Sequence, residues 1–262
     1  MPCRIRCRSA IFVLFSVALL GQEPAAGPEA NPGRPTVSTP ATLTPLKYLQ
    51  FETGVLTARH SPEFSSRTGL NEVIKLTVHP RVQFLVSVEP LVHHREAGRA
   101  ANGTGEVFLG TQAMLIHGEG PRPTVSASYF RRVYDGGVPE LDFGSPRNSG
   151  ILLASADVKG FHYDANALFN EIHEIGRHRL QLGQTLSISH RIGSRFSVSG
   201  EIWHFTQPFL QGDAIGNLWA VGYAARKNLV FDAGVNRGRT ATSTRWEVFA
   251  GFTYLLPYSL WR

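Results

Sequence analysis

Long stretches in which apolar and polar residues alternate are the feature that most limits what this chain can fold into. In residues 180–202, LQLGQTLSISHRIGSRFSVSGEI, apolar residues from Leu180 to Ile188 alternate with Gln, Thr and Ser. A short turn at Gly193 reverses the chain, and the alternation then resumes. Successive side chains of a strand point to opposite faces, so each limb has one apolar and one polar face. The pattern predicts a pair of antiparallel strands that are longer than most strands of globular proteins.

The same alternation recurs from Lys47 onward and predicts an all-β chain of about twelve strands, without a convincing helical repeat. Short turns such as Lys159-Gly160 alternate with longer polar connections such as residues 134–148. Strict alternation of short turns and long loops is typical of transmembrane β-barrels with periplasmic turns and extracellular loops. The predicted strands are residues 47–58, 70–79, 81–92, 104–117, 122–133, 149–158, 160–171, 178–191, 195–206, 215–225, 228–238 and 245–256.

The composition of the polar face favours a barrel over a soluble β-sandwich. A sandwich usually exposes many Lys and Glu, whereas here the polar face is rich in Ser, Gly, Gln and Asn. Strands of ten to twelve residues fit a tilted crossing of a bilayer, where a sheet must close on itself to satisfy its backbone. We therefore predict a transmembrane antiparallel β-barrel over residues 47–262 in the cell outer membrane. Tyr and Trp near strand ends predict aromatic girdles, at Tyr48, Tyr129, Trp203, Trp219, Trp246, Tyr254 and Tyr258.

The N-terminus reads as a secretory signal peptide over residues 1–22. Three arginines precede a thirteen-residue apolar run, Ser9 to Gly21, which is short for a membrane span. Its removal takes away those arginines and no acid, so the formal charge falls from +6 to +3, and both cysteines leave with it. The remaining basic balance is too small and too dispersed to favour nucleic acid as a partner.

Residues 23–46 differ in composition from the rest of the chain. Six prolines and no aromatic residue stand between Glu23 and Pro45. Such a segment buries too little apolar surface to order itself, so the sequence predicts a flexible periplasmic tether in front of the barrel.

The polar faces of the predicted strands supply the candidate functional residues, which would line the barrel lumen. Acids predominate, and this charge would favour cations over anions. The alternative is that these residues form ion pairs that fill a narrow barrel, since twelve strands lie between filled eight-stranded barrels and open porins. The predicted lumen-facing residues are Glu52, Lys75, Glu89, Glu106, Gln112, Arg132, Asp157, His162, Asp164, Gln184, Glu201, Asp232 and Glu247.

Signals for catalysis are poor, and we predict no enzyme, catalytic residue, metal or cofactor. The motif HEIGRH places His173 and His178 five positions apart, so they would not share one helical face as in a zinc protease. Two Ser–His neighbours, His60-Ser61 and Ser189-His190, leave open a barrel hydrolase of the phospholipase type. Neither has an identifiable third group to orient the histidine.

Four stretches, in order, resemble the outer-membrane family named for the meta-pathway of phenol degradation. They are GTGEVFLGTQAML (103–115), GSPRNSGILLASADVKGFHYDANALF (144–169), RFSVSGEIW (195–203) and NLVFDAGVNRG (228–238). The resemblance covers residues 47–256 and implies a channel for small, hydrophobic or aromatic compounds, with no catalytic residues. One departure is the ending SLWR, because barrel proteins commonly end on an aromatic residue that the insertion machinery reads.

These observations together predict a passive outer-membrane channel or facilitator. Its expected partners are outer-membrane lipid, the barrel-assembly machinery and a small-molecule solute. The alternatives are the phospholipase-type barrel and a structural barrel with a plugged lumen.

Overall fold

The computed structural model describes residues 27–96, 98–139, 146–174 and 176–261, and this part of the chain contains thirteen β-strands. Within these ranges, no helix is long and apolar enough to cross a membrane. The predicted signal peptide, residues 1–22, lies outside the described residues. The strands are β1 (Leu49–Arg59), β2 (Ser66–His79), β3 (Val82–Glu96), β4 (Arg99–Gly103), β5 (Val107–Ile116), β6 (Thr124–Tyr134), β7 (Pro146–Val158), β8 (Phe161–Glu174), β9 (Arg177–Ile192), β10 (Phe196–Phe205), β11 (Ala214–Arg226), β12 (Leu229–Gly238) and β13 (Trp246–Leu255).

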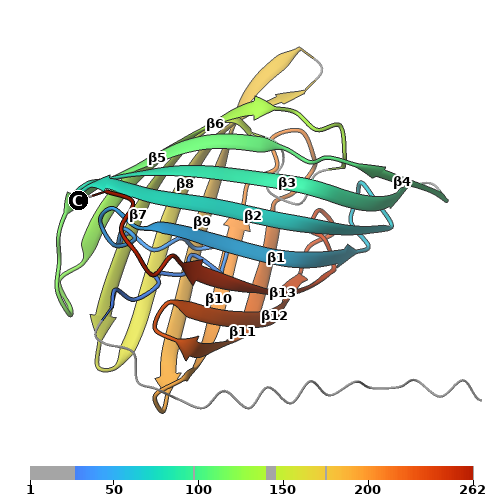
Figure 1. The fold of residues 1–262 in the computed structure, drawn as a ribbon. Coiled ribbons are helices and arrows are strands. Elements are labelled where there is room, and N and C mark those ends of the chain that lie inside the picture. Colours follow the sequence, from blue (N-terminus) through green and yellow to red (C-terminus); the bar gives the residue numbers. More distant parts are fainter. Residues whose placement is uncertain (1–26, 97, 140–145, 175, 262) are drawn as a thin grey trace, which may run out of the picture.

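The strands close into a barrel because β1 pairs with β2 on one side and with β13 on the other. All neighbouring strands are antiparallel, and β5 continues the wall beside β3 (Figure 1). The short β4 pairs only with the end of β3, so twelve of the described strands form the closed wall. The prediction of an all-β, twelve-stranded antiparallel barrel is confirmed.

A β-bulge in β3 lets the strand continue past Pro90. Leu70 pairs with Leu91 and Glu72 pairs with Val88, so Asn71 faces both Glu89 and Pro90. Proline cannot donate a ladder hydrogen bond and is tolerated at bulges. The strand therefore runs on past the proline to Glu96, beyond the predicted end at residue 92.

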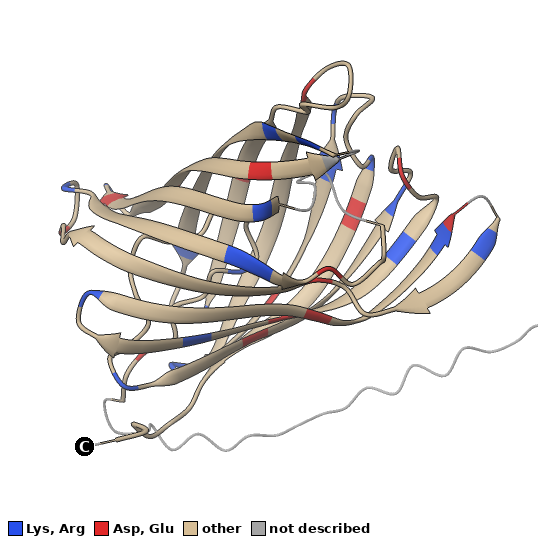
Figure 2. Cartoon of the chain, turned by 90° about the horizontal axis from the view of Figure 1, so that it is seen from above, with Lys and Arg blue, Asp and Glu red and all other residues tan. Residues whose placement is uncertain are grey.

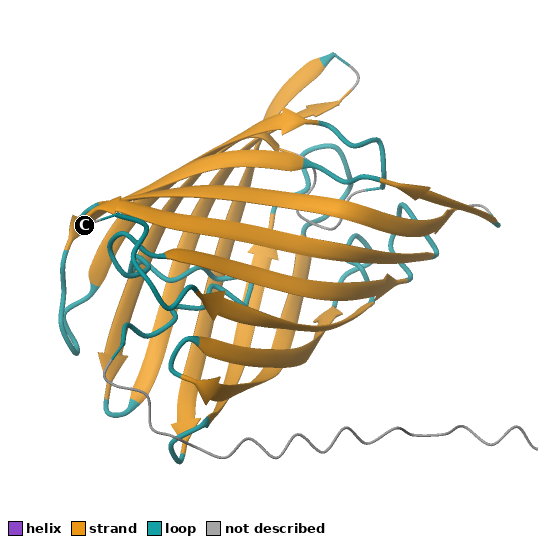
Figure 3. Ribbon diagram, viewed as in Figure 1, coloured by secondary structure: helices purple, strands orange, loops and turns teal. Residues whose placement is uncertain are grey.

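Two of the predicted loops are strand instead. Residues 93–96 extend β3 and pair with β4, and residues 172–174 and 177 extend β8 and β9. The barrel therefore carries two hairpins at its loop end, the end opposite the short turns (Figure 3).

The outer face of the wall is apolar. Phe161, Phe231 and Phe252 are between 36% and 45% exposed, and Ile202 and Trp219 exceed 60%. Every strand of the closed wall has at least one exposed large apolar side chain, and apolar surface of this extent marks an interface with a membrane or a partner rather than with water. The polar residues of the same strands, such as the serines of β6 and β7, are buried on the opposite face. The wall is therefore built inside out relative to a soluble β-sandwich.

Part of the inner face is nevertheless aromatic. Trp203 is 2% exposed and donates its Nε1–H to Asn236 Oδ1 over 2.8 Å, so it does not belong to an interface girdle as we predicted. Its ring lies over Gly216, where a Cβ would come within 2.1 Å of the indole. Phe205 lies over Gly183 in the same way. Glycines in β9 and β11 thus give these rings room to lie flat against the inner wall.

Candidate functional site in the barrel interior

Residues 27–46, which we call the inner segment, lie inside the barrel near its turn end (Figure 1). The structure differs here from the predicted flexible tether. The segment hydrogen-bonds to residues of ten strands, from Gln50 on β1 and Asp232 on β12 around to Thr77 on β2. It therefore follows the inner wall round most of its circumference.

Glu201 of β10 makes the densest contact with the inner segment. One carboxylate oxygen accepts the Val37 amide over 2.7 Å, and the other accepts the Ser38 amide over 2.6 Å and the Ser38 hydroxyl over 2.5 Å. Glu201 is 4% exposed and Ser38 is fully buried. Hydrogen bonds to a charged acceptor are stronger than neutral ones, so this carboxylate holds the middle of the segment against the wall.

Two side-chain amides bond to the backbone of the inner segment in the way that a neighbouring strand would. Gln50 accepts the Asn31 N–H over 2.9 Å and donates to the Asn31 carbonyl over 2.7 Å. Asn166 does the same for Thr39, over 2.7 and 2.9 Å. Buried backbone groups need hydrogen-bond partners, and these amides supply both a donor and an acceptor. The prolines of the segment help, because each removes one N–H that would otherwise need an acceptor.

Charged residues complete the contact at the wall formed by β1, β2 and β12. Glu52 accepts the Gly33 amide over 2.9 Å and pairs with Lys75 over 2.5 Å. Arg34 pairs with Asp232 over 3.1 Å. Its guanidinium lies against Gly54, where a Cβ would come within 2.4 Å of it, and beside Gly251, which pairs with Gly54 across β1 and β13. A larger residue at either glycine would exclude the arginine.

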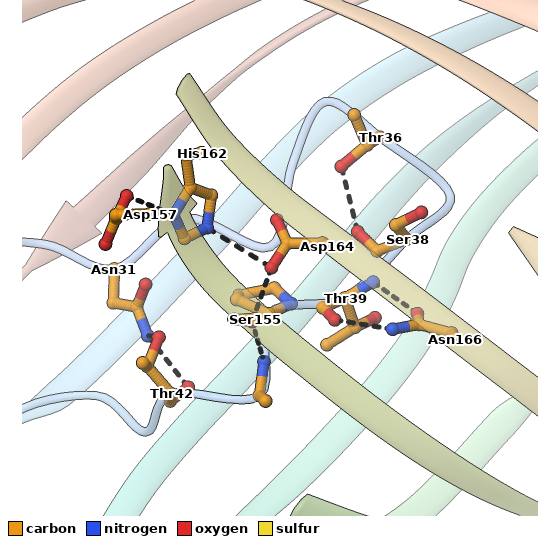
Figure 4. Close-up of polar contacts among 12 residues, drawn as sticks. Asn31, Thr36, Ser38, Thr39, Thr42, Ser155, Asp157, His162, Asp164 and Asn166 are labelled. Carbon is orange, nitrogen blue, oxygen red and sulfur yellow. Dashed lines mark hydrogen bonds and ion pairs between the residues drawn. The ribbon is translucent and has the colours of Figure 1, made fainter. Parts of the chain in front are cut away.

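A polar chain links the turn end of the wall to the inner segment (Figure 4). His162 Nδ1 lies 2.9 Å from Asp157 and Nε2 lies 3.2 Å from Asp164. The Ser155 hydroxyl donates to Asp164 over 2.5 Å and accepts the amide of Ala41 over 2.7 Å. The position of Ala41 is therefore coupled to an imidazole that sits between two carboxylates.

A second polar layer lies toward the loop end. Arg67 is 2% exposed, pairs with Glu89 over 2.5 Å and donates to the Pro139 carbonyl over 3.0 Å. Arg132 pairs with Glu106 over 2.8 Å, and with Asp135 over 3.0 Å. The described part of the long loop after β6 thus folds down over this layer, while residues 140–145 lie outside the described residues.

The predicted lumen-facing residues divide into three groups. Glu52, Lys75, Asp164, Glu201, Asp232 and Glu247 are at most 8% exposed on the inner side of the wall. Glu89, Glu106 and Arg132 form the loop-end layer, and Asp157 and His162 lie at the turn end. Gln112 also faces inward and donates to the carbonyls of Pro40 and Ala41. Gln184 differs from the prediction, because it is exposed on the outer face between Leu182 and Leu186.

The residues considered for catalysis do not assemble. Ser189 and His190 are successive residues of one strand and so project to opposite faces. His173 on β8 and His178 on β9 are cross-strand partners whose rings lie 4.5 Å apart, so they belong to paired strands rather than to a helix. Among the described residues, no group of three or more His, Cys, Asp or Glu side chains is placed to hold a metal ion.

Sequence reasoning missed the inner segment and the neutral amides that hold it. Gln50, Gln83 and Asn166 occupy the same alternate strand positions as the predicted inward-facing acids on their strands. Strict alternation would therefore have placed them inside. No local pattern indicates their partners, since Asn166 and Thr39 are 127 residues apart in the chain.

Three solved structures share this architecture. An outer-membrane channel from Pseudomonas putida F1 matches over 87% of this chain and 100% of its own, with TM-score 0.59 and 11% identity. The KdgM porin matches over 78% and 98%, and the NanC porin over 79% and 98%, each with TM-score 0.52 and 10% identity. The KdgM porin also has a structure in complex with disordered oligogalacturonate. No family model and no curated protein matches the sequence.

The chain therefore has the fold of a porin-like outer-membrane β-barrel. The three similar structures are channels or porins rather than enzymes, and at these sequence identities the likeness concerns the fold.

Proposed function

We propose that this protein lies in the outer membrane and lets small solutes pass through the barrel interior by diffusion. The single observation that carries the proposal is a closed wall that is apolar outside and encloses buried polar residues. With no water in the hydrocarbon layer, such a wall satisfies its own backbone. Its polar interior is held together by hydrogen bonds to the inner segment, which a β-bridge from Leu46 to Thr77 joins to β2 at its C-terminal end.

The proposed path is open only when the inner segment shifts or leaves. While it is docked, Glu201, Asp232 and Glu52 are bound by Ser38, Arg34 and Gly33. When it is displaced, four buried acids remain around the space that it occupied, against one buried lysine, Lys75. These acids are Glu52, Asp164, Glu201 and Asp232. An acidic lining favours cations by charge, so the open state should prefer cations.

Conductance in planar bilayers tests the proposal. The mature chain should give stepwise openings, and a variant lacking residues 27–45 should give larger and longer ones. Heat-modifiable gel mobility would first show that both are folded. If the folded deletion variant conducts no ion, and liposomes containing it do not swell in any small solute, the channel proposal fails. The alternative of a structural barrel, favoured by the occupied interior, predicts openings only in the deletion variant.

Ion selectivity gives a second test with a matched control. In the variant lacking residues 27–45, Glu201→Gln together with Glu247→Gln should reduce the preference for cations. Glu72→Gln is the control, because Glu72 lies on the outer face and accepts a hydrogen bond from Thr53. An unchanged reversal potential after the double substitution would remove the acid-lined lumen from the proposal.

The solute class that we propose is small and partly apolar, as the resemblance to the phenol-degradation family suggests. Its support in the molecule is the aromatic part of the inner face, where Trp203, Phe205 and Phe249 pack around Val37 of the inner segment. Displacing Val37 would uncover these rings to a passing solute. After the rate in protein-free liposomes is subtracted, faster swelling with neutral or cationic aromatic solutes than with sugars of similar size would support this class, and equal rates would exclude it.

A further inference from the structure

Basic residues form a ring on the turns at one end of the barrel, although they are far apart in the sequence. Each of the five turns, between β2 and β3, β5 and β6, β7 and β8, β9 and β10, and β11 and β12, has at least one exposed Lys or Arg at or beside it. Figure 2 shows blue turn tips at the end where the C-terminus lies. The basic turn ring consists of Arg81, Arg122, Lys159, Arg191, Arg195, Arg226 and Lys227.

This ring is only partly neutralised. Exposed acids at the same end are Glu29, Glu119 and Asp157, against seven basic residues. Asp157 is engaged by His162. Within the described residues, the 3.5 Å contact of Arg191 with Glu29 is the one ion pair that the ring makes. The turn end therefore presents a net positive surface, which suits an anionic partner.

Outward-facing aromatic residues lie directly next to the ring. Phe161 follows the Lys159 turn and packs against His190 at 4.7 Å, and Phe196 follows Arg195 and packs against Tyr223 at 5.0 Å. Aromatic residues of this kind sit at the boundary between hydrocarbon and headgroups. Four of the five turns have two or three residues and cannot reach away from that boundary, so their basic side chains end at headgroup level. The connection of β5 to β6, residues 117–123, is longer and contributes Arg122.

We propose that the basic turn ring binds anionic phospholipid headgroups of the leaflet that the short turns face. The inference rests on the proposed membrane location. A lipid fits better than a protein partner, because the charges are spread over five turns around the circumference, whereas a protein would approach one side. Arginine and lysine bind phosphate through charge-assisted hydrogen bonds, and one basic residue near an anionic surface corresponds to about a five-fold gain in affinity at low salt.

Electron spin resonance with spin-labelled lipids tests the proposal in reconstituted barrels. Labelled phosphatidylglycerol should associate more strongly with the wild-type barrel than labelled phosphatidylcholine. Neutralising four ring residues, with Arg191→Gln, Arg195→Gln, Arg226→Gln and Lys227→Gln, should reduce the ratio of the two association constants by about half or more. The matched control replaces the three arginines by lysine, which keeps the charge and should keep the ratio.

Each outcome decides the matter. An unchanged ratio in the Gln variant, or an equal fall in the Lys variant, overturns headgroup binding by charge. If the Gln variant does not fold, the salt dependence of the wild-type barrel supplies the test. The ratio of the two association constants should approach one as the salt concentration rises, because salt screens exposed charges. A ratio that does not change with salt overturns the proposal. If the barrel immobilises neither lipid, the proposed membrane location is contradicted. This result differs from equal immobilisation of both lipids, which contradicts headgroup binding alone.

Discussion

Glu201→Gln should loosen the inner segment at its centre. The carboxylate accepts hydrogen bonds from the Val37 and Ser38 amides and from the Ser38 hydroxyl, on both of its oxygens. Glutamine replaces one oxygen by an NH2 group, which leaves at least one backbone N–H facing a donor. Losing a charge-assisted bond and stranding a buried N–H together cost about 3 kcal/mol, so local opening should become about a hundred-fold easier.

Hydrogen exchange of the folded barrel in detergent measures this opening. A peptide covering residues 27–46 should exchange slowly in the wild type and about a hundred times faster in Glu201→Gln. Glu72→Gln makes the same chemical change on the outer face, where the new amide oxygen still accepts from Thr53, and should exchange like the wild type. Equal protection in all three proteins would show that Glu201 does not hold the segment, and the reasoning would be refuted.

Three further outcomes are expected. Asn166→Leu removes both bonds to Thr39 and should weaken local protection there by about 2 kcal/mol, measured by the same exchange experiment. Gly216→Ala should reduce the heat-shifted folded band, because its Cβ would meet the Trp203 ring, whereas Gly150→Ala has open space and should not. Unboiled wild-type protein should migrate differently from boiled protein in detergent gels, and identical mobility would argue against a closed barrel.

The wall could be predicted from the sequence because the two sides of a membrane strand meet different solvents. Because of this contrast, apolar and polar residues alternate over ten or more positions, as residues 180–202 show. The position of a residue in this alternation, which we call its parity, can indicate the face it occupies even when its residue type suggests the other face. Trp203 shares its parity with Ser199 and Glu201, which indicates the interior, although its aromatic character suggested a girdle. Gln184 is the converse case, a polar residue whose parity places it outside.

The inner segment could not be predicted, because its order comes from the wall rather than from itself. Its composition indicates disorder for an isolated chain. The partners that order it are single side chains on strands far along the sequence, such as Gln83 for Thr44 and Ser155 for Ala41. Proline, usually a sign of flexibility in such a stretch, here lowers the number of donors that the wall must satisfy.

The place of Arg34 has a consequence for assembly. Its guanidinium rests on Gly54 and Gly251, which oppose each other where the first and last strands of the barrel join, and it binds Asp232 on the strand beyond. That resting place does not exist until the two terminal strands have met. The inner segment is synthesised before the strands but must therefore become ordered after them. Once bound, it stabilises the pairing of β1 with β13 that closes the barrel.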